Sequence, residues 1–588
     1  MKKVIKNYEL VVVGGGLSGV VAAIASARHG LKTALVQNRS VLGGNASSEV
    51  RVNINGADRN GAIKNMRETG IVLEILLENK RVNPQHSFNV LDMVMWEAVR
   101  AEENIDLYFN TNISDCVVED GKIKSVTGVQ YTSETEFTFI ADLFADTTGD
   151  ATLAAESGAE WTIGREARSV YNEEHAPEVA DLHTMGTTIL FNTKDMGYAV
   201  PFVKPDWAHT FDKEKLGGRQ LLDLDFGFWW TELGGEELRV IEESENICEE
   251  LYKWVYGIFD YIKNSGEYEA DNLALDWIGS VPGRRESRRI IGDYVLTEND
   301  VVNEARFDDA VAYGGWTMDE HTVGGITATG ADEKGTRWLP FDGIYTIPYR
   351  ALYSKNVDNL FVGGRAISAS HMAMSSTRVI ATCGVIGQAI GTAAAIGIKE
   401  KVTCREIGNH IKDVQKLLIL DDCYLPGIAI EDEKDCCQTA TITASTHIAG
   451  GEPNQITNGH TRCIGETENA WISEEMNGEE WLNVAFDSAK KVSEIEVKFD
   501  PNLSDIMVTT AVIRKISIQE KTMPSVLVKD YNVEFILDGK VVNTLEVRDN
   551  YQRINKHLVD QVTCDNMKIT VLNTYGDKHA RIFEVKAY

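Results

Sequence analysis

The residues best suited to chemistry begin with a glycine-rich turn close to the N-terminus. Residues 14–19 read Gly-Gly-Gly-Leu-Ser-Gly, a G-x-G-x-x-G pattern that follows an apolar run and precedes a segment with helical periodicity. Gly14 allows the tight turn, Gly16 lets the backbone approach a pyrophosphate, and Gly19 lets the helix pack against the sheet. The N-terminus of that helix favours negative charge. The pattern predicts a dinucleotide site, without separating FAD from NAD.

The second strand of this unit ends at Gln37, where dinucleotide-binding folds usually place an acidic residue that binds the adenosine ribose. A neutral amide can still accept a hydrogen bond from a ribose hydroxyl or donate one to it. We therefore expect Gln37, with Asn38 beside it, to face the ribose.

His371 is a candidate proton donor or acceptor, because it precedes a helix rich in small residues and imidazole titrates near neutral pH. On that hypothesis His371→Ala abolishes turnover while the cofactor stays bound. A structural histidine is the alternative, and it is the favoured one.

Four arginines lie close together in an otherwise acidic chain, namely Arg284, Arg285, Arg288 and Arg289. Guanidinium groups suit a carboxylate or a phosphate, and Arg288 is a candidate for holding a substrate carboxylate. Internal ion pairs with Glu286 and Asp293 are the favoured alternative.

The segment Tyr313-Gly314-Gly315-Trp316, followed by Asp319 and His321, combines aromatic faces with polar groups. Such a combination suits the stacking of a sugar or another ring, and His321 becomes a further catalytic candidate. Aromatic residues of a buried loop would have the same sequence.

The elements that must position these residues alternate between strands and helices. Residues 10–13 and 33–36 read as parallel strands on either side of a helix that Gly30 ends. Residues 107–129 read as a hairpin through Asp120-Gly121, and residues 139–144 as a strand that returns to the sheet. A strand at 359–364 and a helix of small residues at 375–396 resume the nucleotide-binding character.

Composition narrows the class of protein. A chain of 588 residues suggests about three or four folding units, and a net charge of -31 argues against a nucleic-acid partner. Nine cysteines without metal-ligand spacing predict reduced thiols, no metal and no iron–sulfur cluster. We see no cleavable leader and no segment of transmembrane length, so we expect a cytoplasmic protein with no membrane partner.

Three segments carry a resemblance to a known family: residues 42–49, residues 283–289, and residues 363–368 followed by His371. Together they resemble the bacterial FAD-dependent oxidoreductases and, more distantly, the flavoproteins of fumarate reductase and succinate dehydrogenase. The resemblance spans roughly residues 8–400 and implies FAD, with residues 43–44 near the flavin and residues 146–150 and 363–365 along the pyrophosphate and ribityl chain. Arg365 stands where many flavoproteins have an aspartate.

The predicted FAD contacts are Gly14, Gly16, Leu17, Ser18, Gly19, Gln37, Asn38, Gly43, Gly44, Asn45, Ser47, Ser48, Ile113, Thr148, Gly149, Asp150, Gly364, Arg365, Ser375, Ser376 and Arg378. The positive end of the small-residue helix would favour negative charge on a reduced flavin. Tight core packing also explains its small residues.

From about residue 435 the chain alternates apolar and polar residues between turns such as Asn458-Gly459 and Asp538-Gly539. This part is similar to galactose-binding-like or discoidin-type β-sandwiches. Such modules often bind carbohydrate, but within an enzyme they also cover a surface or hold an oligomer together.

We therefore predict an α/β protein: a doubly wound, Rossmann-like FAD-binding domain with an inserted α+β cap domain and a C-terminal all-β sandwich. The expected boundaries are 1–160 and 341–405 for the FAD-binding domain, 161–340 for the cap, 406–434 for a linker and 435–588 for the sandwich.

The predicted activity is hydride transfer between a small organic substrate, with a carbohydrate or glycoside as the leading class, and flavin N5. A separate electron donor or acceptor completes the cycle, and a homo-oligomer is left open. One alternative is reduction of an activated carbon–carbon double bond, and another is a carbohydrate-binding protein whose FAD fold is only structural.

Overall fold

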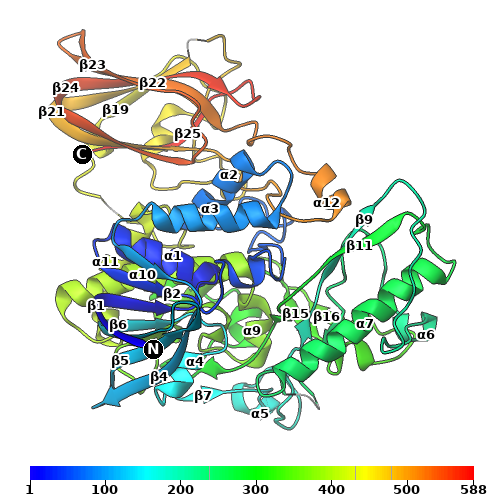
Figure 1. The fold of residues 1–588 in the computed structure, drawn as a ribbon. Coiled ribbons are helices and arrows are strands. Elements are labelled where there is room, and N and C mark those ends of the chain that lie inside the picture. The colour runs from blue at the N-terminus through cyan, green and yellow to red at the C-terminus, as the bar shows by residue number, and fades with distance from the viewer. Residues whose placement is uncertain (237–238, 431, 479) are drawn as a thin grey trace.

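The computed structural model describes residues 1–588 except 237–238, 431 and 479, and it confirms the predicted fold class. A Rossmann-like domain carries the cap on one side and the all-β domain on another (Figure 1). The elements of the first domain are β1 (Lys2–Val13), α1 (Leu17–Arg28), β2 (Thr33–Val36), α2 (Ile71–Val82), α3 (Phe88–Arg100), β3 (Ile105–Tyr108), β4 (Thr111–Glu119), β5 (Lys122–Gln130), β6 (Thr135–Asp146), α4 (Thr152–Glu156), β18 (Leu360–Val362), α9 (His371–Thr377), α10 (Ile380–Glu400) and α11 (Ile411–Leu420).

The central sheet has the order β3-β2-β1-β6-β5-β4, and β18 pairs with β6. β1 is parallel to both β2 and β6, as the apolar runs predict, and all four residues of β2 are buried. The expected hairpin at Asp120-Gly121 joins β4 to β5, and both turn residues have positive φ, as a type I′ turn requires. The carboxyl ends of β1, β2, β6 and β18 therefore meet at one edge of the sheet.

α1 and α10 pack against each other beneath that edge. A Cβ on Gly387 would lie 2.1 Å from the carbonyl oxygen of Ser18, and one on Gly391 would lie 2.3 Å from that of Ala22. Only glycine permits this approach. α10 is also long and apolar enough to cross a membrane, which corrects the expectation that no segment reaches that length. However, 89% of its apolar window is buried inside the protein, because it forms the core helix of this domain.

The small-residue segment is two helices, and the prediction of one continuous helix from 375 to 396 is wrong. Ser370 caps α9 by accepting a hydrogen bond from the Ala373 amide, and α9 ends at Thr377. Val379 is extended, with φ -66° and ψ 146°, and α10 starts at Ile380. Neither Arg378 nor Val379 is a residue that normally breaks a helix, so no residue type marks the break in the sequence.

The cap comprises short sheets around one long helix, in the green part of Figure 1. Its elements are β7 (Trp161–Thr162), α5 (Arg168–Tyr171), β8 (Thr187–Thr188), β9 (Phe191–Asp195), α6 (Lys213–Leu216), β10 (Glu232–Leu233), α7 (Ser244–Asn264), β11 (Leu273–Ile278), β12 (Gly283–Arg284), β13 (Arg289–Ile290), α8 (Glu298–Val302), β14 (Ala310–Gly314), β15 (Met318–His321), β16 (Thr336–Leu339) and β17 (Tyr345–Pro348). α7 buries an aromatic-rich face, including Trp254 and Phe259, against Phe191 and Trp230.

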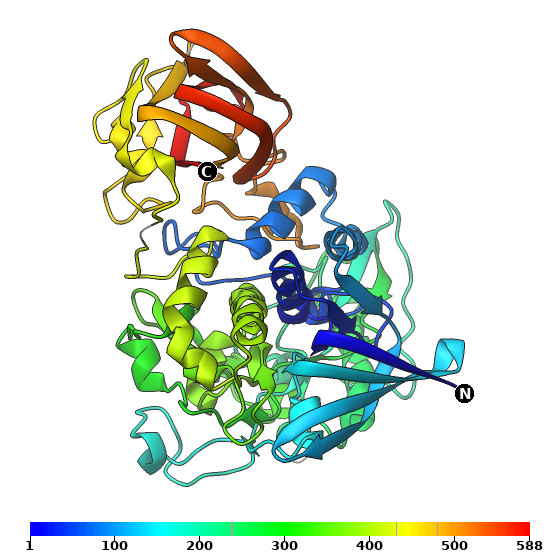
Figure 2. The same cartoon turned by 90° about the vertical axis from the view of Figure 1, so that its left-hand side faces the viewer.

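The C-terminal domain is all β apart from short helices. Its strands are β19 (Thr441–Ala444), β20 (Trp471–Ile472), β21 (Glu480–Phe499), β22 (Val528–Leu537), β23 (Lys540–Val547), β24 (Ile554–Thr574) and β25 (Arg581–Ala587), and α12 (Ile513–Ser517) interrupts them. The order is β20-β25-β21-β24-β22-β23, with β19 beside β21. The strands curl around a core of their own that includes Trp471 and Phe535 (Figure 2).

The C-terminal domain is bound closely to the first domain. Leu73 and Leu77 of α2 belong to its hydrophobic core, and Arg462 donates hydrogen bonds to the carbonyl oxygens of Asn65 and Arg67. The segment expected as a linker contains α11, whose Val414 and Leu418 pack in the core of the first domain.

Candidate active site

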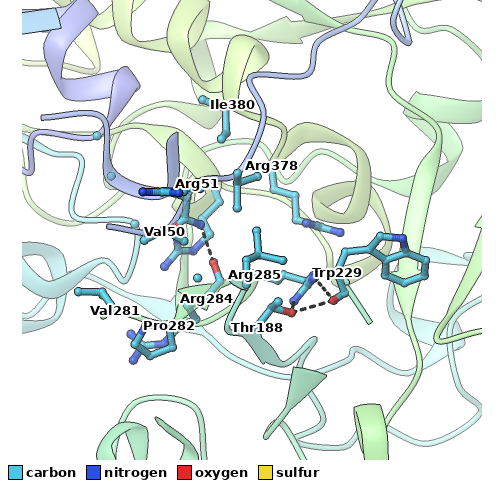
Figure 3. A pocket seen from close by; sticks show the side chains of 18 of the residues that line it. Val50, Arg51, Thr188, Trp229, Val281, Pro282, Arg284, Arg285, Arg378 and Ile380 are labelled. Atoms are coloured by element: carbon cyan, nitrogen blue, oxygen red, sulfur yellow. Dashed lines mark hydrogen bonds between the residues drawn. The ribbon is translucent and has the colours of Figure 1, made fainter. Parts of the chain in front are cut away.

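A cavity of about 1010 Å³ lies where the first domain, the cap and one segment of the C-terminal domain meet. The glycine turn lines one end of it. Side chains of the cap line the other end, among them Thr188, Trp229 and Arg285 (Figure 3).

The dinucleotide end is made mainly of backbone. Gly14 has φ +108°, and a Cβ there would lie 2.4 Å from the carbonyl group of Thr147. A Cβ on Gly19 would lie 1.9 Å from the carbonyl oxygen of Gly14, so Gly19 sets the helix–strand packing rather than facing the cavity. Gly16 differs: it lines the cavity, and a Cβ there would meet no heavy atom within 4 Å. This open face is space for a ligand.

The first turn of α1 points its amides at the same space. Its N-cap is Gly16, no side chain caps it, and no acidic residue lies in its first turn. Ser18 adds a buried hydroxyl that has no hydrogen-bond partner within the described part of the chain. An uncapped helix terminus with an unsatisfied buried hydroxyl is a site for an anion.

Gln37 supports the glycine turn from behind. Its side-chain carbonyl accepts a hydrogen bond from the Gly15 amide at 2.8 Å, and its amide donates to the carbonyl oxygen of Val41 at 3.0 Å. Gln37 and Asn38 both line the cavity. The neutral side chain thus bonds the loop, which an acidic residue could do only as an acceptor.

Asp150 forms ion pairs with two arginines at the dinucleotide end of the cavity. Arg284 and Arg365 both bond its carboxylate, Arg365 at 2.6 Å, and the Ser287 hydroxyl donates to it at 2.8 Å. Burial alone would raise the pKa of Asp150, but the two guanidinium groups hold it below the ordinary value. Arg365, which stands where many flavoproteins have an aspartate, is therefore held in place by an aspartate from another loop.

Most of the predicted FAD contacts line the cavity, namely Gly14, Gly16, Leu17, Ser18, Gln37, Asn38, Gly43, Gly44, Asn45, Ile113, Thr148, Gly149, Asp150, Gly364, Arg365 and Arg378. The cavity lining does not include Gly19, Ser47, Ser48, Ser375 or Ser376. Ser375 bonds the carbonyl oxygen of Met372 within α9, and Ser376 bonds that of Trp316. The helix break explains this placement, because it brings Arg378 and the α10 N-terminus to the cavity instead.

The other end of the cavity is made of side chains. His321 and Asp319 of β15 line it, together with Trp229, Arg285 and Thr188 from the cap. The Trp229 ring meets the His321 ring edge to face, with centroids 5.4 Å apart. Arg285 donates to the hydroxyl of Thr188 and to the carbonyl oxygen of Trp229 (Figure 3). Sequence reasoning missed Trp229 and Thr188, because neither lies in a recognisable motif.

His321 has an acidic partner on each side of its ring. Glu232 lies 2.5 Å from Nδ1, and Asp319 lies 3.4 Å from Nε2. Arg285 donates its Nε–H to His321 Nε2 at 3.2 Å, which requires an unprotonated Nε2. Once Nε2 carries a proton, its N–H can donate a hydrogen bond to the carboxylate of Asp319. The geometry therefore accommodates both protonation states of the ring.

The two carboxylates stay ionised in this setting. Burial alone would raise the pKa of each, but Arg285 and His321 lower that of Glu232, and His321 and Arg378 hold that of Asp319 well below its ordinary value. Each ring nitrogen of His321 therefore faces an ionised carboxylate.

His371 and Arg288 lie outside the cavity lining. His371 is buried in α9, with Nδ1 3.0 Å from Glu286, and Glu286 also pairs with Arg289. Arg288 lies over the Trp161 ring, 5.2 Å from its centroid. The expected ion pair of the arginine group with Glu286 is confirmed through Arg289, but that with Asp293 is wrong, since Asp293 pairs with Arg405.

The aromatic segment is divided between two places. Trp316, Asp319 and His321 line the cavity, whereas Tyr313 is buried and donates to the carbonyl oxygen of Arg67 at 2.9 Å. Trp338 of β16 joins the cavity lining instead. Strand pairing of β15 with β16 brings Trp338 opposite Asp319, a neighbour that spacing along the chain cannot show.

The glycine turn, the uncapped α1 and the acid–base group in one cavity define a dinucleotide-dependent oxidoreductase. The chain belongs to the FAD dependent oxidoreductase family, whose model matches residues 9–418. FAD is the cofactor, and the residues fit it: the open face of Gly16, the amides of α1 and the unsatisfied hydroxyl of Ser18 suit its pyrophosphate.

One curated relative is the tRNA uridine 5-carboxymethylaminomethyl modification enzyme MnmG of Finegoldia magna. It is 32% identical over 139 residues, which cover 21% of this chain and 22% of that enzyme. The chain thus matches about a fifth of that relative's length.

Several solved carbohydrate-binding modules also match. The lectin domain of lectinolysin with Lewis B antigen has 9% identity and a TM-score of 0.21, and the match covers 27% of this chain and 98% of that domain. The family 32 module of C. perfringens NanJ with galactose has 17% identity and a TM-score of 0.19, with 26% and 97% covered. The Streptococcus pneumoniae fucose-binding module SpX-3 has 8% identity and a TM-score of 0.20, with 26% and 96% covered.

Proposed function

We propose that this FAD-dependent oxidoreductase moves a hydride between a small organic substrate and flavin N5, and that His321 holds the accompanying proton. The observation that carries the proposal is the position of His321: it faces the same cavity as the glycine turn, with a carboxylate at each ring nitrogen. FAD, when bound, supplies the two-electron acceptor or donor.

In the oxidising direction an alcohol loses a hydride from carbon and a proton from oxygen. His321 takes that proton at Nε2, where Arg285 donates while the ring is neutral and Asp319 accepts after protonation. Glu232 holds Nδ1 and stabilises the imidazolium that results. In the reducing direction the same nitrogen returns the proton.

A carbohydrate or glycoside is our leading substrate class. Trp229, Trp316 and Trp338 line this end of the cavity, and Trp229 and Trp338 remain 40% and 48% exposed. Exposed indole faces beside carboxylates and arginines suit a ring with several hydroxyl groups. The substrate would lie between these rings and His321.

A second candidate is reduction of an activated carbon–carbon double bond. Arg285 and Arg378 point into the same space from different elements (Figure 3). Two guanidinium groups suit a carboxylate conjugated to such a bond, and His321 would then donate the proton. This role falls to Arg285 and Arg378 rather than to Arg288, which does not line the cavity.

A separate electron carrier completes the cycle in either case, and we place the reaction in the cytoplasm. The carrier would exchange electrons with the flavin in a second half reaction, after the substrate has reacted in the first.

The test is an anaerobic absorbance spectrum of the full-length protein, recorded before and after a panel of sugars, glycosides and enoates. Bleaching of the flavin band by a sugar supports the carbohydrate proposal. Reoxidation of the dithionite-reduced protein by an enoate, with no bleaching by sugars, supports the second candidate. A panel that neither bleaches the oxidised flavin nor reoxidises the reduced one contradicts both.

A further inference from the structure

An arm of the C-terminal domain reaches the cavity. The arm consists of residues 500–527, which leave the domain after β21 and return at β22. Its α12 lies beside the cap, far from the strands that carry it (Figure 1). Val512, Arg514 and Lys515 of the arm line the cavity. The C-terminal domain therefore contributes directly to the site that the other two domains form.

The arm is anchored to the first domain before it reaches the cavity. Asn79 of α2 donates to the Thr509 hydroxyl at 2.9 Å, and His86 Nδ1 lies 3.1 Å from the carbonyl oxygen of Val508. Lys80 bonds the carbonyl oxygen of Glu520 at 2.5 Å. These contacts hold both ends of the segment that carries α12.

The arm is also anchored to the cap. Val512 is buried against Leu190 and Phe226. The Ile513 amide donates to Asp225 at 2.7 Å, and the Arg514 guanidinium bonds the carboxylate of Asp223. Contacts on both sides make the arm a fixed wall of the cavity.

The cavity is basic although the chain is acidic. The whole chain has 89 acidic and 58 basic residues, but the charged residues of the cavity lining in the described structure are ten basic and four acidic. Several of the basic groups pair with carboxylates: Arg284 and Arg365 with Asp150, Arg514 with Asp223, Arg285 with Glu232, Arg378 with Asp319 and Arg39 with Glu49. The basic lining residues that form no ion pair within the described part of the chain are Arg51, Arg219, Lys334 and Lys515.

Lys515 is the clearest member of that unpaired group. Within the described part of the chain, the hydrogen bonds of Lys515 involve only its backbone N–H and C=O groups. Its ammonium group has no hydrogen bond or ion pair there, although Lys515 lines the cavity. Burial and the neighbouring Arg514 lower the pKa of Lys515, because both disfavour its charged form, and the carboxylate of Asp223 only partly opposes them. A cation in this position gains stability from an anion that enters the cavity.

We propose that the substrate carries an oxyanion, a carboxylate or a phosphate, and that Lys515 is a specificity-determining residue that binds it. This inference rests on the proposed function, because it describes the ligand of the same cavity. It makes the C-terminal domain part of the substrate site. Arg285 and Arg378 line the cavity beside His321, and they would orient the same charged ligand toward the proton carrier.

The experiment measures binding rather than turnover. Full-length FAD-loaded protein is titrated with D-gluconate, glucose 6-phosphate and uncharged D-glucose, and binding is followed by tryptophan fluorescence and by the flavin difference spectrum. We expect one of the two anions to bind more tightly than glucose. Lys515→Gln weakens its binding by about tenfold, and Lys515→Arg keeps it within about threefold. Which anion binds separates carboxylate from phosphate.

The matched control is Lys521→Gln, which removes the same charge from the same arm at an exposed position that does not line the cavity. It should leave all three dissociation constants unchanged. Equal weakening by both glutamine variants, tighter binding of glucose than of either anion, or no binding of either anion overturns the inference. If an anion binds through Lys515 but no compound exchanges electrons with the flavin, the proposed function fails while this inference stands.

Discussion

The two ends of the cavity are built in different ways. At the dinucleotide end, the ligand space is bounded by backbone, at Gly16, at the first turn of α1 and at residues 147–150. At the substrate end, it is bounded by side chains such as Trp229 and His321, and by Lys515 from the C-terminal arm. Close approach of the backbone to a ligand requires particular residue types, above all glycine. A side chain of almost any type can instead be placed at a cavity by distant parts of the fold.

The two ends have different tasks, because the cofactor is constant and the substrate is not. A pyrophosphate is the same in every FAD, so one backbone geometry serves it. Substrates differ, and the groups that would meet them come from the cap, from the residues before α10 and from the arm. Substitutions at the two ends should therefore have separable effects on cofactor binding and on turnover.

The largest effect is expected from Gly16→Ala. A Cβ at Gly16 meets no protein atom within 4 Å but enters the space for the pyrophosphate, so the apoprotein stays folded while FAD binding weakens by at least about a hundredfold. The ratio of flavin to protein absorbance and the melting temperature of the apoprotein measure the two quantities.

Gly408→Ala is the control, because Gly408 also has open space around its Cβ position but lies outside the cavity. Normal FAD content in Gly16→Ala would show that the cofactor does not use this face, and the comparison between the two ends would lose its basis.

The next largest effect is expected on kcat, and it distinguishes His321 from His371. His321→Asn should lower kcat by about a hundredfold, because it removes the proton carrier, while FAD content and reduction by dithionite stay normal. His371→Asn is the paired variant: His371 is buried beside Glu286 outside the cavity, so its loss should lower stability more than turnover. The reverse pattern, with a normal kcat for His321→Asn and loss of turnover for His371→Asn, would restore His371 as the catalytic residue.

A third effect, on stability rather than on turnover, concerns two buried carboxylates that lie behind the ends of the cavity. Asp146, behind the dinucleotide end, accepts hydrogen bonds on both carboxylate oxygens. Glu68, behind the α10 N-terminus, accepts bonds from Ala57 and Thr382 on one oxygen, and the other has no partner among the residues described. Burial raises the pKa of Glu68 to about 7.

Because the folded state of Glu68 binds its proton more tightly than the unfolded state, its contribution to stability is complete below the unfolded pKa and is lost as pH rises through about 7. The total loss is on the order of 3 kcal/mol. Glu68→Gln should therefore melt at a higher temperature than wild type at pH 8 and at nearly the same temperature at pH 5. Glu97→Gln, at an exposed position of α3, is the control. Identical pH dependence of wild type and Glu68→Gln would show that Glu68 does not titrate in this range.

The smallest effect is expected from Val512→Ala. It removes methyl groups that pack the arm against Leu190 and Phe226, so the arm is held less firmly and KM rises by about threefold at unchanged FAD content. Val542→Ala, on the exposed surface of β23, should change neither quantity. A loss of FAD in Val512→Ala would mean that the arm supports both ends of the cavity.

Sequence reasoning worked best where the backbone needs particular residues. Gly14 and Gly19 have contacts that exclude any Cβ, and the hairpin turns at Asp120-Gly121 and Asp538-Gly539 have the positive φ values that their residue types predict. It was wrong about the continuous helix, because an extended Val379 follows from tertiary packing and leaves no mark in composition. It also placed Ser375 and Ser376 at the cofactor for the same reason.

The sequence by itself determined the glycine turn and a dinucleotide as the cofactor class, because local geometry near a dinucleotide tolerates few residue types. Only the tertiary structure decided which histidine and which arginines line the cavity, and that Lys515 of the C-terminal domain lines it too. Those placements depend on packing between residues hundreds of positions apart, and such packing fixes the position of a side chain without requiring any pattern in the chain around it.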